Sequence, residues 1–188
     1  MLLIGITAVS VVAAVLICLL GGVSFWWLPL LLLGCFLGAA ALAFGFLWLM
    51  CAIVDFDKPQ EHDSKFYRFL AKIYIEALVP LVQVRIHKRG LEQLPKKGPY
   101  VVMCNHQSIA ACPQAELTFI SKKENHDMFL IGKIMHKLMC QLLDRDNDRQ
   151  ALKVIIRCIQ LVRDEKMNLG VFPEGYCTTN GRLQHFRP

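Results

Sequence analysis

The chain has 188 residues and a formal net charge of +6 at pH 7, and every Asp, Glu, Lys and Arg lies at or after Asp55. The uncharged segment before Asp55 excludes a chain that is water-soluble throughout, and the basic remainder favours an anionic partner. With an apolar segment in the same chain, anionic lipid or a phosphorylated substrate is favoured over nucleic acid. The eight cysteines form no CxxC pair or zinc-ligand spacing, so we expect reduced thiols and no metal site.

Two apolar runs fill the uncharged segment, and each predicts a helix. Leu2–Leu20 comes first, Gly21 and Gly22 interrupt the pattern, and Leu30–Val54 follows. A helix needs about 20 apolar residues to cross the hydrocarbon core of a bilayer, so both runs are long enough. The first run lacks a basic n-region and a second run follows it, which argues against a cleaved signal peptide. Residues 1–54 are therefore predicted to be a membrane-anchor helical hairpin that either spans the bilayer or dips into one leaflet.

Basic residues follow the second run closely: Lys58, Lys65, Arg68 and Lys72. The positive-inside rule places this end of the hairpin, and the domain after it, on the cytoplasmic side of the membrane. Within a linker over residues 55–80, helical spacing of apolar residues predicts an amphipathic helix over Ser64–Val79 that ends near Pro80. Such a helix either lies on the membrane surface or packs on the soluble domain.

Residues 81–188 are predicted to form one α/β domain with a partly parallel sheet, because short apolar runs alternate with helical patterns. The expected strands are Val82–His87, Tyr100–Cys104 and Leu169–Phe172. The expected helices are Asp127–Met139 and Asn147–Asp164, and Asn147 or Asp148 is the candidate N-cap of the second.

Two motifs directly follow predicted strands, where α/β sheets build ligand sites. Asn105-His106 follows the predicted strand Tyr100–Cys104, and a neutral imidazole is well suited to removing a hydroxyl proton near pH 7. Phe172-Pro173-Glu174-Gly175 forms a tight turn that leaves the Glu174 carboxylate projecting. The alternatives are a histidine that caps the next helix and a solvated glutamate in a turn.

Two further motifs supply cations. Lys122 and Lys123 follow the apolar residues Phe119-Ile120, and Arg145 lies in the sequence Leu143-Asp144-Arg145. Arginine binds phosphate oxygens through two parallel hydrogen bonds. The alternative for Arg145 is a surface ion pair with a neighbouring aspartate.

In order and context these motifs resemble the glycerolipid acyltransferase family, most closely the bacterial 1-acyl-sn-glycerol-3-phosphate (lysophosphatidic acid) acyltransferases. The resemblance covers about residues 64–188. It rests on Tyr100-Val-Val-Met-Cys-Asn-His-Gln-Ser, Phe-Ile-Ser-Lys-Lys-Glu, Leu-Asp-Arg and Val171-Phe-Pro-Glu-Gly. It implies transfer of a fatty acyl group from acyl-CoA or acyl carrier protein to the sn-2 hydroxyl of lysophosphatidic acid, which makes phosphatidate in phospholipid biosynthesis.

The resemblance also assigns roles to the candidate residues. His106 is the general base, and Glu174 with Gly175 belongs to the acceptor site. Asn105 is a substrate-binding residue beside His106, and the substrate phosphate is assigned to Lys122, Lys123 and Arg145. The resemblance implies a membrane-lipid partner and no metal, bound cofactor or nucleic acid.

The sequence departs from the family pattern at one catalytic position. The aspartate that orients the family's histidine would fall on Ala111, and the segment from His106 to Phe119 is shorter than usual. Loss of an orienting aspartate costs about 10⁴ in rate, so we expect little or no activity from this chain.

Tyr176-Cys177 replaces the family's Thr-Arg, and the fourth motif would lie beyond Pro188, which predicts a C-terminally incomplete domain. The alternative function is that of a catalytically defective or truncated member that only binds acidic lipid.

Overall fold

The structure is a computed structural model of the chain, and it is described in two compact units. Unit 1 comprises Met1–Asp55 with Leu70–Val84, and unit 2 comprises Phe56–Phe69 with Arg85–Pro188. The residues that the structure describes are 1–83, 90–93, 95, 98–103, 117–144, 146–164 and 167–173.

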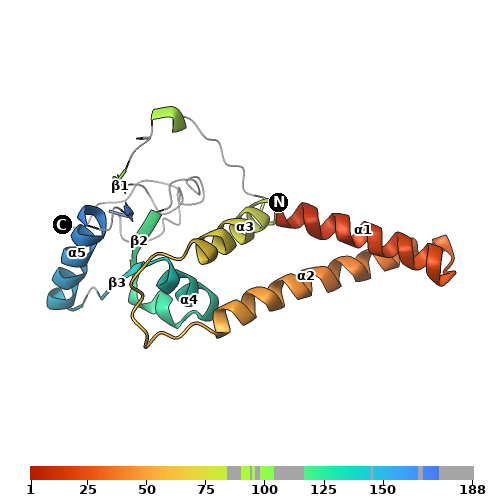
Figure 1. Cartoon of the computed structure of the whole chain (residues 1–188), viewed down its shortest axis with the longest axis horizontal. Helices are drawn as coiled ribbons and strands as arrows, with labels where there is room; N and C mark the ends of the chain where they lie inside the picture. Colours follow the sequence, from red (N-terminus) through yellow and green to blue (C-terminus); the bar gives the residue numbers. More distant parts are fainter. Residues whose placement is uncertain are drawn as a thin grey trace. The chain divides into compact units, whose positions relative to one another are not determined.

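Unit 1 contains the predicted pair of apolar helices. Helix α1 (Leu2–Gly21) ends at Gly22, whose φ of 64° is the left-handed conformation that glycine adopts without strain. A short 3₁₀ turn, η1 (Phe25–Trp27), leads into α2 (Leu28–Ala52). The two long helices pack along each other as a hairpin (Figure 1). The structure thus confirms the two helices, although α2 begins two residues before the predicted Leu30 because Pro29 is well tolerated in a first helical turn.

The apolar side chains of this hairpin mostly point outward. Trp26 is 92% exposed and Leu42 is 78% exposed, whereas α1 buries the small residues Ser10, Ala14 and Cys18. In the described part of the chain, two helical stretches are long and apolar enough to cross a membrane, Leu2–Gly21 and Phe25–Ala52. Outward-facing apolar side chains on helices of this length suggest association with a membrane.

Helix α3 (Lys65–Leu81) extends beyond the end that the sequence predicts. Pro80 lies inside the helix, and the chain turns after it: Val82 N–H donates to Leu78 O and Gln83 N–H donates to Pro80 O. Gln83 has a φ of 57°, a left-handed conformation typical of helix ends. The predicted strand Val82–His87 is therefore wrong in its first two residues, which form this turn, and its remainder lies outside the described residues.

Unit 2 is built on a parallel sheet, as the sequence predicts. The sheet of the described residues has the order β1-β4-β2-β3, and each neighbouring pair is parallel. The strands are β1 (Val101–Met103), β2 (Leu117–Lys122), β3 (Gln141–Leu143) and β4 (Asn168–Val171). Strand β1 lies within the predicted Tyr100–Cys104, and β4 overlaps the predicted Leu169–Phe172 but begins one residue earlier and ends one residue earlier. The sequence pattern predicts neither β2 nor β3, because β3 is too short to show an alternation and β2 runs directly into charged residues.

Helix α5 (Asp148–Arg163) matches its prediction closely and covers part of the sheet. The side chain of Asn147 caps it by accepting a hydrogen bond from Gln150 N–H at 3.1 Å. Its buried residues Val154 and Cys158 pack with Leu169 of β4, and four partly buried residues surround them: Ile120, Leu143, Val162 and Val171. Burial raises the pKa of the Cys158 thiol to about 11, so this thiol is protonated at neutral pH.

The other helical segment begins with the 3₁₀ helix η4 (Lys123–Asp127) and continues as α4 (Phe129–Lys137). The chain before α3 is fastened to α4. His136 Nε2 lies 3.1 Å from Lys58 O, Lys137 Nζ donates to Gln60 Oε1 at 2.9 Å, and Ser64 N–H donates to Lys137 O. Residues 58–64 are thus held by specific contacts and do not form a loose linker.

Arg68, at the start of α3, joins this segment to the sheet. Its guanidinium makes two parallel bonds to Asp63, at 2.7 and 2.9 Å, and a third to Leu117 O at 3.0 Å. Thr118, the residue after Leu117 in β2, is fully buried, and its hydroxyl donates a hydrogen bond to Leu138 O at 2.5 Å. A paired arginine and a satisfied buried hydroxyl fix where β2 begins.

The close approach of η4 to α4 requires a glycine at position 132. A Cβ added there would lie 2.2 Å from His126 O and 3.1 Å from Asn125 O, both backbone atoms. We expect Gly132→Ala to lower the thermal unfolding midpoint, because overpacking of about 1–3 kcal/mol exceeds the gain in helix propensity of about 1 kcal/mol. Circular dichroism of the detergent-solubilised chain measures this.

Gly38→Ala is the matched control, since a Cβ at Gly38 in α2 meets nothing within 4 Å. It should leave the midpoint unchanged or raise it. An equal effect of the two substitutions would show that contact with η4 does not limit position 132.

Candidate functional site at the carboxyl edge of the sheet

The sheet brings the carboxyl ends of its strands to one edge. In register, Met103 of β1 lies opposite Val171 of β4, and Lys122 of β2 lies opposite Leu143 of β3. Because the pairings are parallel, the chain leaves all four strands in the same direction. Each of the four sequence motifs begins at the last residue of one of these strands or within two residues after it, so the motifs begin from a single edge.

Most of the predicted site residues lie outside the described residues. These are Asn105, His106, Arg145, Glu174 and Gly175, together with Ala111. Their assignments stay predictions. The structure does describe the ends of the strands that precede them, and it describes Lys122 and Lys123.

Phe172, the first residue of the Phe-Pro-Glu-Gly motif, is positioned by stacking. Its ring lies parallel to that of Phe119 in β2, with centroids 5.7 Å apart and an interplanar angle of 10°. Gly170 between them has no room for a side chain, since a Cβ would lie 2.3 Å from the Phe119 ring. The stacking therefore sets the direction in which the chain leaves β4.

Lys122 and Lys123 lie at the end of β2 beside an open hollow of about 510 Å³. Lys122 is the last residue of the strand and is exposed, while Lys123 begins η4. The hollow is also lined by residues of η4, of the end of β3 and of the segment that follows it: Glu124, Asp127, Leu143, Asp144 and Asp146. The structure thus brings the predicted lysines next to Asp144 of the Leu-Asp-Arg motif.

The two lysines differ in their partners. Lys123 Nζ lies 3.2 Å from Asp144 Oδ2, and Asp146 N–H donates to Asp144 Oδ1 at 3.2 Å. These two contacts, the lysine first, hold the pKa of Asp144 below its ordinary value. The ion pair is therefore formed above the ordinary pKa of an aspartate and is lost only as the pH falls through the lower folded value. Within the described part of the chain, Lys122 makes no ion pair.

Gln150 supports this edge, and the sequence predictions miss it. Its Oε1 accepts a hydrogen bond from Asp144 N–H at 2.9 Å, and its Nε2 donates to Leu142 O at 2.8 Å. The spacing of Asn147 and Gln150 is the available signal, since it matches a capping box. In a capping box the glutamine side chain turns back to the N-cap amide, whereas here it binds the end of β3.

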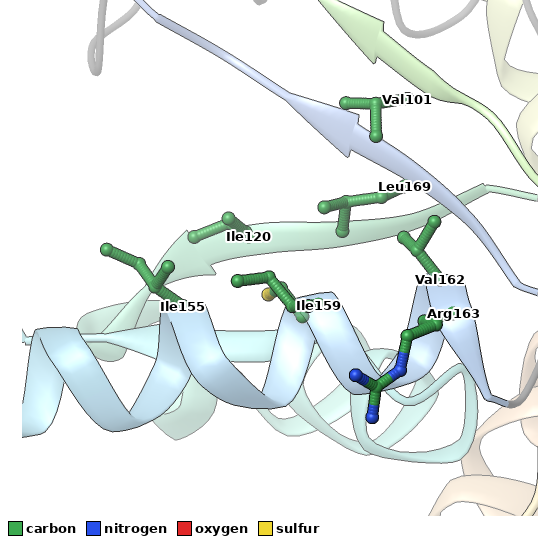
Figure 2. Close-up of a pocket in the computed structure, with 8 residues that line it drawn as sticks. Val101, Ile120, Ile155, Ile159, Val162, Arg163 and Leu169 are labelled. Carbon is green, nitrogen blue, oxygen red and sulfur yellow. The ribbon is translucent and has the colours of Figure 1, made fainter.

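A second hollow, apolar and of about 310 Å³, lies between α5 and one face of the sheet. Figure 2 shows its lining side chains on α5 and on the strands: Val101, Ile120, Ile155, Ile159, Val162 and Leu169. Arg163 lies at one end, where its guanidinium is paired with Asp164 at 2.7 and 3.1 Å. Cys158 also lines this hollow, and because its thiol stays protonated at neutral pH the hollow offers mainly apolar contact.

No cluster of three or more His, Cys, Asp or Glu side chains that could hold a metal ion occurs among the residues described. The described edge combines the paired ammonium group of Lys123 and the exposed one of Lys122 with carboxylates, and such groups can bind a charged substrate.

We expect Gln150→Leu to destabilise the protein by about 1–3 kcal/mol, because Leu142 O and Asp144 N–H lose their partner in a partly buried place. Hydrogen exchange of the Asp144 amide should accelerate by a larger factor than that of amides in the middle of α5.

Gln160→Leu makes the same chemical change at an exposed position of the same helix, and serves as the control. It should alter neither the unfolding midpoint nor the exchange of the Asp144 amide. Unchanged exchange in Gln150→Leu would contradict the supporting role of Gln150.

Comparison with known proteins gives one match. No curated protein and no solved structure matches the chain. The model of one family, described as Acyltransferase, matches residues 85–188. The match covers more than half of the chain and includes all four strands of the sheet with the motifs that follow them. The chain therefore belongs to the acyltransferase family.

Proposed function

We propose that this protein transfers a fatty acyl group from acyl-CoA or acyl carrier protein to the sn-2 hydroxyl of 1-acylglycerol 3-phosphate, and so forms phosphatidate. The observation that supports the proposal is the common edge of the sheet, because a histidine motif, a lysine pair, an arginine motif and a glutamate motif each begin at or just after the end of one of four parallel strands. Membership of the acyltransferase family supports the reaction type. The cationic side chains support an acceptor that carries a phosphate.

In the proposed mechanism, His106 accepts the proton of the acceptor hydroxyl as the oxygen attacks the thioester carbonyl. The tetrahedral intermediate then collapses, the carbon–sulfur bond breaks, and the leaving thiolate takes a proton from the imidazolium. Glu174 and Gly175 hold the acceptor, and Asn105 contributes to the site beside His106. No metal or bound cofactor takes part in these steps.

The phosphate of the acceptor is assigned to the lysines at the end of β2 and to Arg145. Charge-assisted hydrogen bonds of this kind are about twice as strong as neutral ones. Of these residues, Lys122 is exposed at the edge and Lys123 is bound to Asp144. Acceptors without a phosphate would lose these interactions, which would give the enzyme its preference for a phosphorylated lysolipid.

The N-terminal hairpin fits a reaction whose acceptor and product are both lipids. We place the catalytic domain on the cytoplasmic side, since basic residues follow α2 closely and cytoplasmic flanks carry such residues. Epitope tags at the two termini should both be removed by protease from inverted membrane vesicles and both be protected in right-side-out vesicles. Removal of the two tags from opposite sides would contradict the hairpin.

The expected catalytic activity of this chain is low because Ala111 occupies the position of the family's orienting aspartate. Without a carboxylate to orient and stabilise the imidazolium, we expect membranes that contain the unaltered chain to form little or no phosphatidate from acyl-CoA and lysophosphatidic acid. Ala111→Asp should raise the rate, with an upper limit of about 10⁴-fold. The product is measured by thin-layer chromatography with a labelled acyl donor.

His106→Ala in the Ala111→Asp background is the control, and it should return the rate to the background level. Robust phosphatidate formation by the unaltered chain would contradict the expected role of Ala111 while supporting the proposed reaction. Activity that survives His106→Ala would contradict the assignment of the general base.

A second function is favoured by Ala111 itself. A family member that lacks the orienting aspartate could bind acidic lipid without turning it over. Binding of lysophosphatidic acid that Arg145→Ala weakens, with no product from either the unaltered chain or Ala111→Asp, would identify the protein as such a binder.

A further inference from the structure

The two adjacent lysines at the end of β2 are not equivalent. Lys123 is bound to Asp144, whereas Lys122 makes no ion pair with any residue that the structure describes. We propose that Lys122 supplies the ammonium charge for the substrate phosphate, and that Asp144 is a specificity-determining residue that withdraws Lys123 from it. This inference rests on the proposed function, because it names the group that recognises the phosphorylated acceptor.

Asp144 is held in place from several sides. Its backbone N–H is bound by Gln150 Oε1 at 2.9 Å, and its Oδ1 accepts from Asp146 N–H at 3.2 Å. The remaining oxygen, Oδ2, faces Lys123 Nζ at 3.2 Å. A carboxylate fixed in this way pairs with Lys123 without help from a substrate, so a phosphate that competed for Lys123 would have to displace an existing, solvent-exposed ion pair.

The charges around the two lysines support the different roles proposed for Lys122 and Lys123. The described lining of the hollow contains Lys122 and Lys123 with four carboxylates, at Glu124, Asp127, Asp144 and Asp146. These six side chains sum to a charge of −2 when all are ionised. In such an acidic surrounding a phosphate is attracted only by a cation that no carboxylate has paired. Of the two lysines in this described lining, that cation is Lys122.

The experiment measures binding by the full-length chain in non-ionic detergent micelles. The probes are 1-acylglycerol 3-phosphate and monoacylglycerol, which differ by the phosphate, and titration calorimetry gives the Kd of each. Lys122→Gln should weaken binding of the phosphorylated probe about 10-fold, as expected for a charge-assisted hydrogen bond, and should leave monoacylglycerol binding unchanged. Lys123→Gln should weaken it less than about twofold, because its partner is already Asp144.

The decisive variant is the double substitution Lys122→Gln with Asp144→Asn. Because the second substitution frees Lys123 from Asp144, the double variant should bind the phosphorylated probe roughly threefold more tightly than Lys122→Gln alone. If Asp144 only maintained the shape of the edge, the second substitution would weaken binding further, and that result would overturn the inference. Equal losses in Lys122→Gln and Lys123→Gln would overturn it as well.

Lys153→Gln on α5 is the matched control, because it removes the same charge from an exposed lysine away from this edge. It should leave both Kd values unchanged. An unaltered chain that binds the two probes equally would also overturn the inference. Phosphate-dependent binding without any acyl transfer would leave the inference standing and would count against the catalytic part of the proposed function alone.

Discussion

Parallel pairing of the four strands is the constraint on which the rest of this site depends. A parallel sheet sends every strand out at the same edge, so segments far apart in the sequence begin side by side. Met103 and Val171 are separated by 68 positions in the chain, yet their Cα atoms are partners in the sheet. The segments that carry the predicted site residues therefore start from one edge of the sheet.

Around this edge, polar side chains bind the backbone of neighbouring elements. Arg68 binds the carbonyl at the start of β2, and Gln150 binds the backbone on both sides of Leu143 at the end of β3. Close packing complements these bonds at Gly170, where a strand passes beneath an aromatic ring. An edge held in this manner can present charged groups in fixed positions, which reduces the reorganisation that substrate binding requires.

Charged side chains are unevenly distributed along the chain. Helices α1 and α2 carry none, whereas unit 2 contains both basic and acidic residues, of which Lys123 and Asp144 neutralise each other. The net charge of +6 therefore does not describe the hollow beside β2, whose described lining is acidic. Local pairing decides which cations remain available to a substrate, and this cannot be read from composition.

The sequence by itself determined the apolar hairpin, the parallel α/β character, helix α5 and the acyltransferase family, because these depend on local periodicity and motif order. It narrowed the N-cap of α5 to Asn147 or Asp148, and the structure shows Asn147. It did not reveal β2 or β3, the continuation of α3 through Pro80, or the role of Gln150. Short strands become strands through their neighbours in the sheet, and a helix end depends on the turn that follows it. Only the tertiary structure paired Lys123 with Asp144 and left Lys122 apart, since that choice depends on which strand lies next to β2.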